Sequence, residues 1–227
     1  MNEIESGVLY IVSTPIGNLS DITLRALNIL KNVDVIACED TRHSLKLLNH
    51  YEIKKHLISY HSYNEKNSTN GIIKLIDEGK SVALISDGGT PAISDPGSLL
   101  IKECIDNNIK VIPIPGASGL LTILVASGFK TDNFFFHGFL SVKQGKRKKQ
   151  LESISAIETT HIIYESPFRL LKLIDSIEEI FENKLICVGK ELTKINEKII
   201  IGNIEEVKLQ LNNEKIAGEF IVLIANY

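Results

Sequence analysis

Short apolar segments alternate with helix-length segments through the first half of the chain, and this alternation limits the folds that the chain can adopt. Strands are predicted at residues 8–13, 33–38, 57–60, 81–86 and 110–113. Helices are predicted between them, the first capped by Ser20 or Asp21 and the others at residues 41–49, 65–78 and 98–106. Strands separated by such helices indicate parallel βαβ units with helices on both faces of the sheet. The first half therefore predicts an α/β domain with a parallel sheet.

The second half has a less regular pattern. A segment with two prolines and a glycine at residues 113–116 suggests a boundary, so we expect an N-terminal domain at 1–114 and a C-terminal domain at 115–227. A helix is predicted at residues 118–127. Further strands are predicted at residues 134–137, 160–164, 185–189, 194–201 and 219–225. Their spacing predicts a second α/β domain whose sheet is mixed.

Composition favours an ordinary globular protein of the cytoplasm. The chain has 227 residues, of which 44% are hydrophobic, and a formal net charge of −3. Its start carries no basic segment typical of a signal peptide, and its apolar runs are too short to cross a membrane. Cys38, Cys104 and Cys187 are widely spaced within apolar stretches, which predicts buried thiols in a reducing compartment.

A loop rich in glycine and proline follows the fourth predicted strand. Residues 87–97 contain three glycines, two prolines and two aspartates, far more than an ordinary turn requires. Loops at the carboxyl ends of parallel strands are where α/β folds bind ligands. Residues 14–18 follow the first strand in the same way but lack the G-x-G-x-x-G pattern of a dinucleotide site. The pattern predicts a ligand site that is not of the nicotinamide type.

Two polar clusters follow other predicted strands. Residues 39–43 combine two carboxylates, an arginine and a histidine, although a helix cap would explain part of this cluster. Residues 164–169 contain Glu165 and Arg169 around Pro167, a residue suited to the first position of a helix. Either cluster could bind substrate or transfer protons. The histidines show no metal-ligand spacing.

A basic segment begins another predicted helix. Five of the seven residues from 143 to 149 are cations: Lys143, Lys146, Arg147, Lys148 and Lys149. Cations repel one another and are unfavourable at a helix N-terminus, where a phosphate backbone would compensate them. A solvated helix start is the alternative, and the net charge of the whole chain does not favour a dedicated nucleic-acid-binding domain. We interpret the segment as an RNA contact.

Taken together, these segments resemble the tetrapyrrole methylase family, also called class III methyltransferases. The closer resemblance is to its branch of small-subunit ribosomal RNA cytidine 2′-O-methyltransferases. The matching segments are residues 13–23, 39–42, 86–97, 115–118, 164–167, 191–194 and 218–220. The resemblance implies a homodimer of two-domain α/β subunits, with S-adenosylmethionine in the cleft between the domains and ribosomal RNA or the small ribosomal subunit as substrate. By motif, the cofactor site would be lined by Pro15, Asp87, Gly88, Thr90, Ile93, Ser118, Gly119, Tyr164, Leu192 and Gly218.

The chemistry expected is attack of a ribose 2′-oxygen on the methyl group of the sulfonium, without a metal. Positioning can supply several kcal/mol of the barrier, and a base helps because a ribose hydroxyl is a poor nucleophile. Asp40 and Glu165 are the candidate bases. Arg42, Arg169 and Lys190 are the candidates to hold phosphates or the developing oxyanion.

Three other functions fit parts of the sequence. A tetrapyrrole methyltransferase of the same superfamily would have no use for the basic segment at 143–149. A serine hydrolase built on Ser118 would require a glycine where Leu120 stands. An RNA-binding module without catalysis would bind RNA and leave the cofactor unused.

Overall fold

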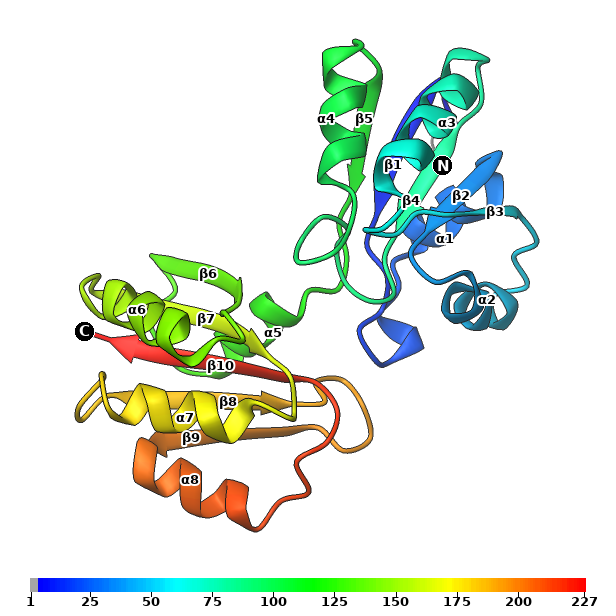
Figure 1. Cartoon of the computed structure of the whole chain (residues 1–227). Helices are drawn as coiled ribbons and strands as arrows, with labels where there is room; N and C mark the ends of the chain where they lie inside the picture. Colours follow the sequence, from blue (N-terminus) through cyan, green and yellow to red (C-terminus); the bar gives the residue numbers. More distant parts are fainter. Residues whose placement is uncertain (1–3) are drawn as a thin grey trace. The chain divides into compact units, whose positions relative to one another are not determined.

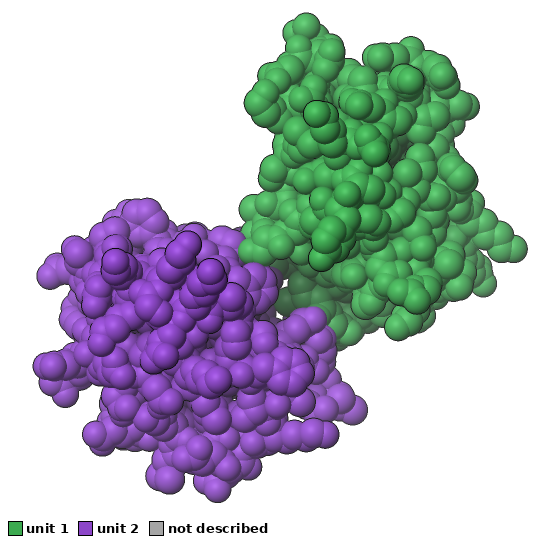
Figure 2. All heavy atoms as spheres, in the orientation of Figure 1, with its two compact units in different colours: residues 1–118 green, residues 119–227 purple. Residues whose placement is uncertain are grey.

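The chain folds into two compact units, residues 1–118 and 119–227, which Figure 2 shows in different colours. The computed structural model describes residues 4–227. The division falls after Ser118, whereas the sequence places it after residue 114. Contacts of Ser13 explain the difference. The N–H of Ser13 donates to the carbonyl of Ile114. A Cβ at Gly116 would lie only 2.9 Å from the Cβ of Ser13, so the chain after Ile114 stays close to Ser13. Residues 115–118 are thus packed on the first unit.

The first unit contains a five-stranded sheet in the order β3-β2-β4-β1-β5, and every strand pair is parallel (Figure 1). This arrangement confirms the predicted parallel α/β domain. The strands are β1 (Val8–Val12), β2 (Val35–Cys38), β3 (His56–Ser59), β4 (Val82–Ile85) and β5 (Lys110–Ile114). Because all the strands run the same way, the loops that follow them gather at one edge of the sheet.

Helices cover both faces of this sheet. They are η1 (Leu19–Asp21), α1 (Leu24–Asn32), α2 (Thr41–His50), α3 (Glu65–Asp77) and α4 (Ser98–Asp106). One core joins Tyr10 of β1 to Leu30 of α1, and the other joins Leu9 of β1 to Ile72 of α3. Successive residues of β1 therefore enter opposite cores, which is why the strands are apolar throughout.

The first helix starts later than predicted. Asn18 accepts a hydrogen bond from the backbone N–H of Ser20 and begins the short 3₁₀ helix η1. Thr23 then has extended backbone and accepts from the N–H of Ala26, so Thr23, not Ser20 or Asp21, caps α1.

The second unit contains a mixed five-stranded sheet in the order β6-β7-β10-β8-β9, as predicted. β6 and β7 are parallel, whereas β10 is antiparallel to both β7 and β8, and β9 is antiparallel to β8. The strands are β6 (Phe134–Phe139), β7 (Thr159–Glu165), β8 (Leu185–Lys190), β9 (Lys198–Asn203) and β10 (Phe220–Asn226). The predicted strand at 194–201 starts instead at Lys198, because the residues before it form a turn closed by a hydrogen bond from Lys194 N–H to the Glu191 carbonyl.

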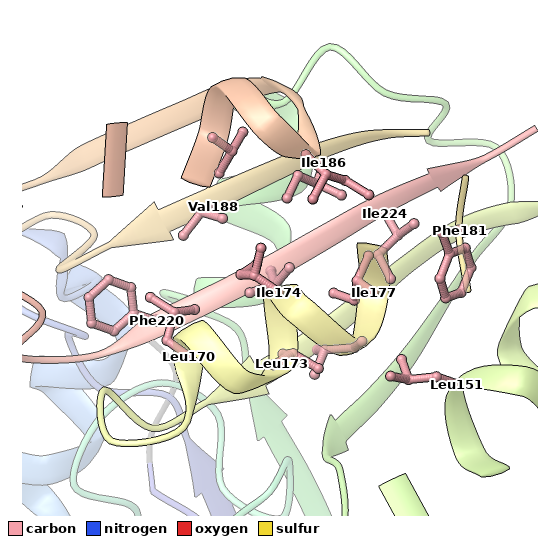
Figure 3. Close-up of a cluster of buried hydrophobic side chains, with 14 of the residues drawn as sticks. Leu151, Leu170, Leu173, Ile174, Ile177, Phe181, Ile186, Val188, Phe220 and Ile224 are labelled. Carbon is pink, nitrogen blue, oxygen red and sulfur yellow. The ribbon is translucent and has the colours of Figure 1, made fainter. Parts of the chain in front are cut away.

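Three helices cover one face of the second sheet, and α5 (Gly119–Ala126) packs on the other. The three are α6 (Gln144–Ser155), α7 (Leu170–Glu178) and α8 (Ile204–Asn212). Figure 3 shows their core, in which Leu151, Leu173 and Phe220 belong to one buried cluster. On the opposite face, a Cβ at Gly189 would lie 2.8 Å from Ile123 of α5. Gly189 therefore allows α5 to approach the sheet closely.

The state of the cysteines agrees with the sequence-based expectation. Cys38, Cys104 and Cys187 are buried and free, and burial raises the pKa of Cys187 to about 12. Between residues 4 and 227, no helix combines the length and apolar character needed to cross a membrane.

Candidate active site

The loops after β1 and β4 are joined at the carboxyl edge of the first sheet. Thr14 and Gly89 exchange two backbone hydrogen bonds, each 2.9 Å long. The hydroxyl groups of Ser13 and Thr90 lie 2.9 Å apart, and the Thr14 hydroxyl donates to the carbonyl of Ser86 at 3.2 Å. The two motifs that the sequence places far apart thus form one structure. Pro15, Gly88 and Thr90, three predicted cofactor residues, are brought together there.

The loop from Ser86 to Gly97 is held in conformations that an ordinary turn would not require. Ala92 and Ser94 have φ values of 69° and 66°, and Gly97 has a φ of 140°. A Cβ at Gly97 would lie 2.9 Å from Leu84, and one at Gly88 would lie 3.3 Å from the Pro15 carbonyl oxygen. The glycines allow the backbone to pass these neighbours, and Ile93 is left 42% exposed at the surface of the loop.

Four carboxylates lie near this edge: those of Glu39, Asp40, Asp87 and Asp95. Asp40 caps α2 by accepting from the backbone N–H of Arg42 at 2.8 Å, and its carboxylate also pairs with the Arg42 guanidinium at 3.2 Å. These hydrogen bonds lower the pKa of Asp40. Asp87 accepts a hydrogen bond from the backbone N–H of Asp40 at 3.3 Å.

Glu39 is the carboxylate that sequence reasoning did not select. Burial raises the pKa of Glu39, and the charges of Asp95, Asp87 and Asp40 raise it further. Its position directly after β2 could have identified it, but only the fold brings Asp87 and Asp95 from another loop to its side. A half-buried carboxylate with a raised pKa is better suited to accept a proton than the neighbouring Asp40.

In the second unit, Glu165 and Lys190 lie in one row across the sheet, because both pair with Phe220 of the strand between them. Phe220 belongs to the core beneath α7 and α8, so all three side chains are on that face. Glu165 is buried and its carboxylate lies 2.6 Å from the Arg169 guanidinium. Lys190 is also buried and pairs with Glu214 at 3.0 Å.

Tyr164 lies on the opposite face of this sheet from these predicted catalytic residues. Its ring contacts Phe136 edge to face at a centroid distance of 4.8 Å. Tyr164 and Glu165 are consecutive in a strand, so their side chains point to opposite faces. The structure thus does not bring Glu165, Arg169 and Lys190 together with Tyr164. Pro167 is not at the first position of a helix, because α7 starts at Leu170 with Arg169 as its N-cap.

Two other predicted cofactor residues of the second unit, Leu192 and Gly218, lie at a tight turn. Glu191 has a φ of 50°, and its carboxylate fills the space that a side chain at Gly218 would occupy. Burial by itself would raise the pKa of Glu191, but hydrogen bonds from Lys194 and from the N–H of Glu219 lower it. Leu192 is buried, and a depression of about 510 Å³ borders Gly218, Glu191 and Lys190.

The basic segment forms the start of α6, as predicted, but its side chains differ in exposure. Lys143, Lys146 and Lys149 are exposed, and Lys148 pairs with Glu179 at 3.2 Å. Arg147 is buried, with only 5% of its surface exposed, and so differs from the exposed lysines around it. Its place in the helix explains this, because Arg147 lies on the same face as the core residue Leu151.

A family model described as tetrapyrrole (corrin/porphyrin) methylases matches residues 8–208. The chain belongs to this family. The resemblance inferred from the sequence motifs is therefore confirmed. As a tetrapyrrole methylase family member, the chain carries its family motifs on the loops of both sheets. Among residues 4–227, no cluster of three or more His, Cys, Asp or Glu side chains is placed to hold a metal ion.

Curated relatives agree with this assignment, and a solved structure shares the fold. The chain is 50% identical over 216 residues to the ribosomal RNA small subunit methyltransferase I of Mycoplasmopsis pulmonis, covering 95% of this chain and 96% of the relative. It is 45% identical over 220 residues to the Bacillus subtilis protein of the same name, covering 97% of this chain and 75% of that protein. A diphthine synthase structure has the same fold, with a TM-score of 0.74 at 14% identity, covering 96% of this chain and 90% of that one.

Proposed function

We propose that the chain transfers a methyl group from S-adenosylmethionine to the 2′-oxygen of a cytidine ribose in small-subunit (16S) ribosomal RNA. The main support is the 50% identity, along almost the whole of both chains, to a protein named ribosomal RNA small subunit methyltransferase I. The joined, glycine-rich loops at the edge of the first sheet support it further, because they are the ligand-binding end of a parallel sheet. We also propose a cytoplasmic location, where ribosomal RNA is modified.

The first unit has groups that suit this cofactor. Burial and the charges of Asp95, Asp87 and Asp40 raise the pKa of Glu39, so the negatively charged form of Glu39 is disfavoured. A cationic ligand bound nearby would relieve this repulsion. When bound, S-adenosylmethionine supplies an electrophilic methyl group on a positively charged sulfur. The residues proposed to hold it are Pro15, Asp87, Gly88, Thr90, Ile93, Ser118, Gly119, Tyr164, Leu192 and Gly218.

The residues of this chain have to orient a ribose hydroxyl and accept its proton. Asp40 is less suited to accept it than predicted, since Arg42 lowers the pKa of this carboxylate. Glu165 is engaged by Arg169. We therefore propose Glu39 as the proton acceptor, with Asp40 keeping Arg42 at the start of α2, where its exposed guanidinium can contact a phosphate. Lys190 and Arg169 are proposed to act on RNA and not on the reacting oxygen.

Two substitutions distinguish the roles of the neighbouring carboxylates of Glu39 and Asp40. We expect Glu39→Gln to lower the rate of methyl transfer about 100-fold, because general-base catalysis is worth roughly that factor. The matched variant Asp40→Asn keeps a good helix cap and should change the rate much less. Single-turnover transfer of tritiated methyl groups to unmodified small subunits measures both. Equal rates for Glu39→Gln and the native protein would remove Glu39 from the mechanism.

The function itself is tested in one preparation. Calorimetric titration with S-adenosylhomocysteine should show binding, and tritium should enter the ribosomal RNA at a position resistant to alkaline cleavage, because a 2′-O-methyl group blocks the attacking hydroxyl. Label on a base would contradict the ribose assignment. A protein that binds no S-adenosylhomocysteine would contradict the function as a whole.

We also propose that the chain acts as a homodimer. The second unit exposes large apolar side chains on α5 and β6, including Leu121, Val125, Phe135 and Phe139, which are 50%, 76%, 50% and 53% exposed. β6 is also an edge strand. Sedimentation equilibrium should give twice the mass of the chain, and Val125→Glu should shift the protein towards the monomer. A monomer at micromolar concentration would contradict the proposal.

A further inference from the structure

A buried arginine without a partner lies at the start of α6. Arg147 is 5% exposed, and its Nε atom is buried without a hydrogen-bond partner. Among residues 4–227, no carboxylate lies within ion-pair distance of its guanidinium. A buried charge is costly unless it is paired, so the buried guanidinium of Arg147 is suited to an anionic ligand.

Other unsatisfied groups belong to the same end of the second sheet. β6 and β7 are parallel neighbours, and α6 follows the first as α7 follows the second, so both helices begin at the same edge of the sheet (Figure 1). Arg169, the N-cap of α7, has a buried Nε atom without a partner, and so does Oε2 of Glu165 at the end of β7. Arg147, Arg169 and Glu165 together carry one net positive charge.

The helix ends add donors to this edge. Neither Lys143 nor Arg169, the N-cap residues of α6 and α7, makes a side-chain capping hydrogen bond. The first N–H groups of α6 have no acceptor within the helix, and the helix dipole favours an anion there. A Cβ at Gly145 would meet nothing within 4 Å, so there is open space beside the first turn. Side chains in a helix point back towards its N-terminus, which directs Arg147 to this end.

We propose that Arg147 and the first turn of α6, with Arg169 held in place by Glu165, bind one phosphate group of the RNA backbone. The inference rests on the proposed function, and it goes further by separating a buried phosphate site from the exposed lysines around it. A phosphate accepts several hydrogen bonds at once, and a guanidinium provides paired donors for it. Glu165 is then a positioning residue for Arg169.

The test uses the native protein, Arg147→Met, Arg147→Lys and a control, with fluorescence anisotropy of a labelled fragment of unmodified small-subunit ribosomal RNA at several KCl concentrations. Arg147→Met should weaken binding about tenfold and reduce the salt dependence by about one phosphate contact. Arg147→Lys should recover part of the affinity. The control Lys208→Met removes the same charge from a side chain already paired with Asp175 and Glu178, and should bind like the native protein.

Thermal stability distinguishes a phosphate-binding role of Arg147 from a purely structural one. Because Arg147 has no partner to lose, Arg147→Met should melt at or above the native temperature, and inorganic phosphate should raise the melting temperature of the native protein but not that of Arg147→Met. Native RNA affinity and salt dependence in Arg147→Met would overturn the proposal, and so would failure of this variant to fold. If the native protein methylates no ribosomal RNA but its RNA binding still depends on Arg147, the proposed function fails and the phosphate site stands.

Discussion

Replacing Glu165 by Leu is expected to lower the free energy of unfolding of the second unit by about 3 kcal/mol or more, the usual cost of removing one partner of a buried ion pair. The Glu165 side chain is 1% exposed, and its Oε1 atom accepts from both the Arg169 guanidinium at 2.6 Å and the Ser166 N–H at 2.7 Å. Without this carboxylate, the guanidinium of Arg169 is left largely buried and uncompensated. Urea denaturation followed by circular dichroism measures the change.

A double-mutant cycle identifies the cause. Glu165→Leu combined with Arg169→Leu should recover much of the lost stability, because the pair is then replaced by apolar side chains. Asp106→Leu is a matched control that breaks the exposed pair between Asp106 and Lys102, and it should have far less effect. If Glu165→Leu keeps the stability of the native protein, the ion-pair explanation is wrong.

Acidification from pH 8 to pH 5 is expected to destabilise the second unit through a pair of histidines. Nε2 of His137 lies 3.0 Å from Nδ1 of His161, and Nε2 of His161 lies 2.9 Å from the Ile157 carbonyl oxygen. His161 therefore donates to Ile157 and accepts from His137, which requires the His161 ring to be neutral. Burial lowers the pKa of His137 to about 4, with a further contribution from His161, and burial also lowers the pKa of His161.

The direction of the effect follows from these shifts. The unfolded chain takes up a proton at each histidine near pH 6.5, whereas the folded chain does so only at a lower pH. Stability is thus complete above pH 6.5 and falls as the pH drops towards the folded pKa. For His137 the loss by pH 5 is up to about 2 kcal/mol, or roughly 10 °C in melting temperature.

Differential scanning calorimetry at several pH values measures this loss. His137→Gln retains an amide donor that can reach Nδ1 of His161 but does not titrate, so its melting temperature should depend less on pH over the same range. An equal fall in His137→Gln and in the native protein would assign the pH dependence to other groups.

The family could be found from the sequence because its motifs are continuous stretches of chain. Residues 86–97 and 115–118 carry enough specific side chains to be identified without a structure. The predicted helix at 98–106 coincides with α4 (Ser98–Asp106), since a glycine precedes it and its apolar residues recur with helical spacing. The first helix was misplaced because Ser20, Asp21 and Thr23 are all good caps, and local propensity does not choose among them.

The sequence by itself determined most of the helices and strands, the parallel and mixed sheets, and the loops that carry the family motifs, because each depends on hydrophobic periodicity or on turn residues within a short stretch. Tertiary structure decided which groups meet. The strand order places β4 beside β1 and so joins Thr14 to Gly89. The packing of α6 buries Arg147 among a run of exposed lysines. Burial raises the pKa of Glu39, and Asp95 and Asp87 on another loop raise it further. Burial and charge depend on neighbours that are distant in sequence, and no local pattern records them.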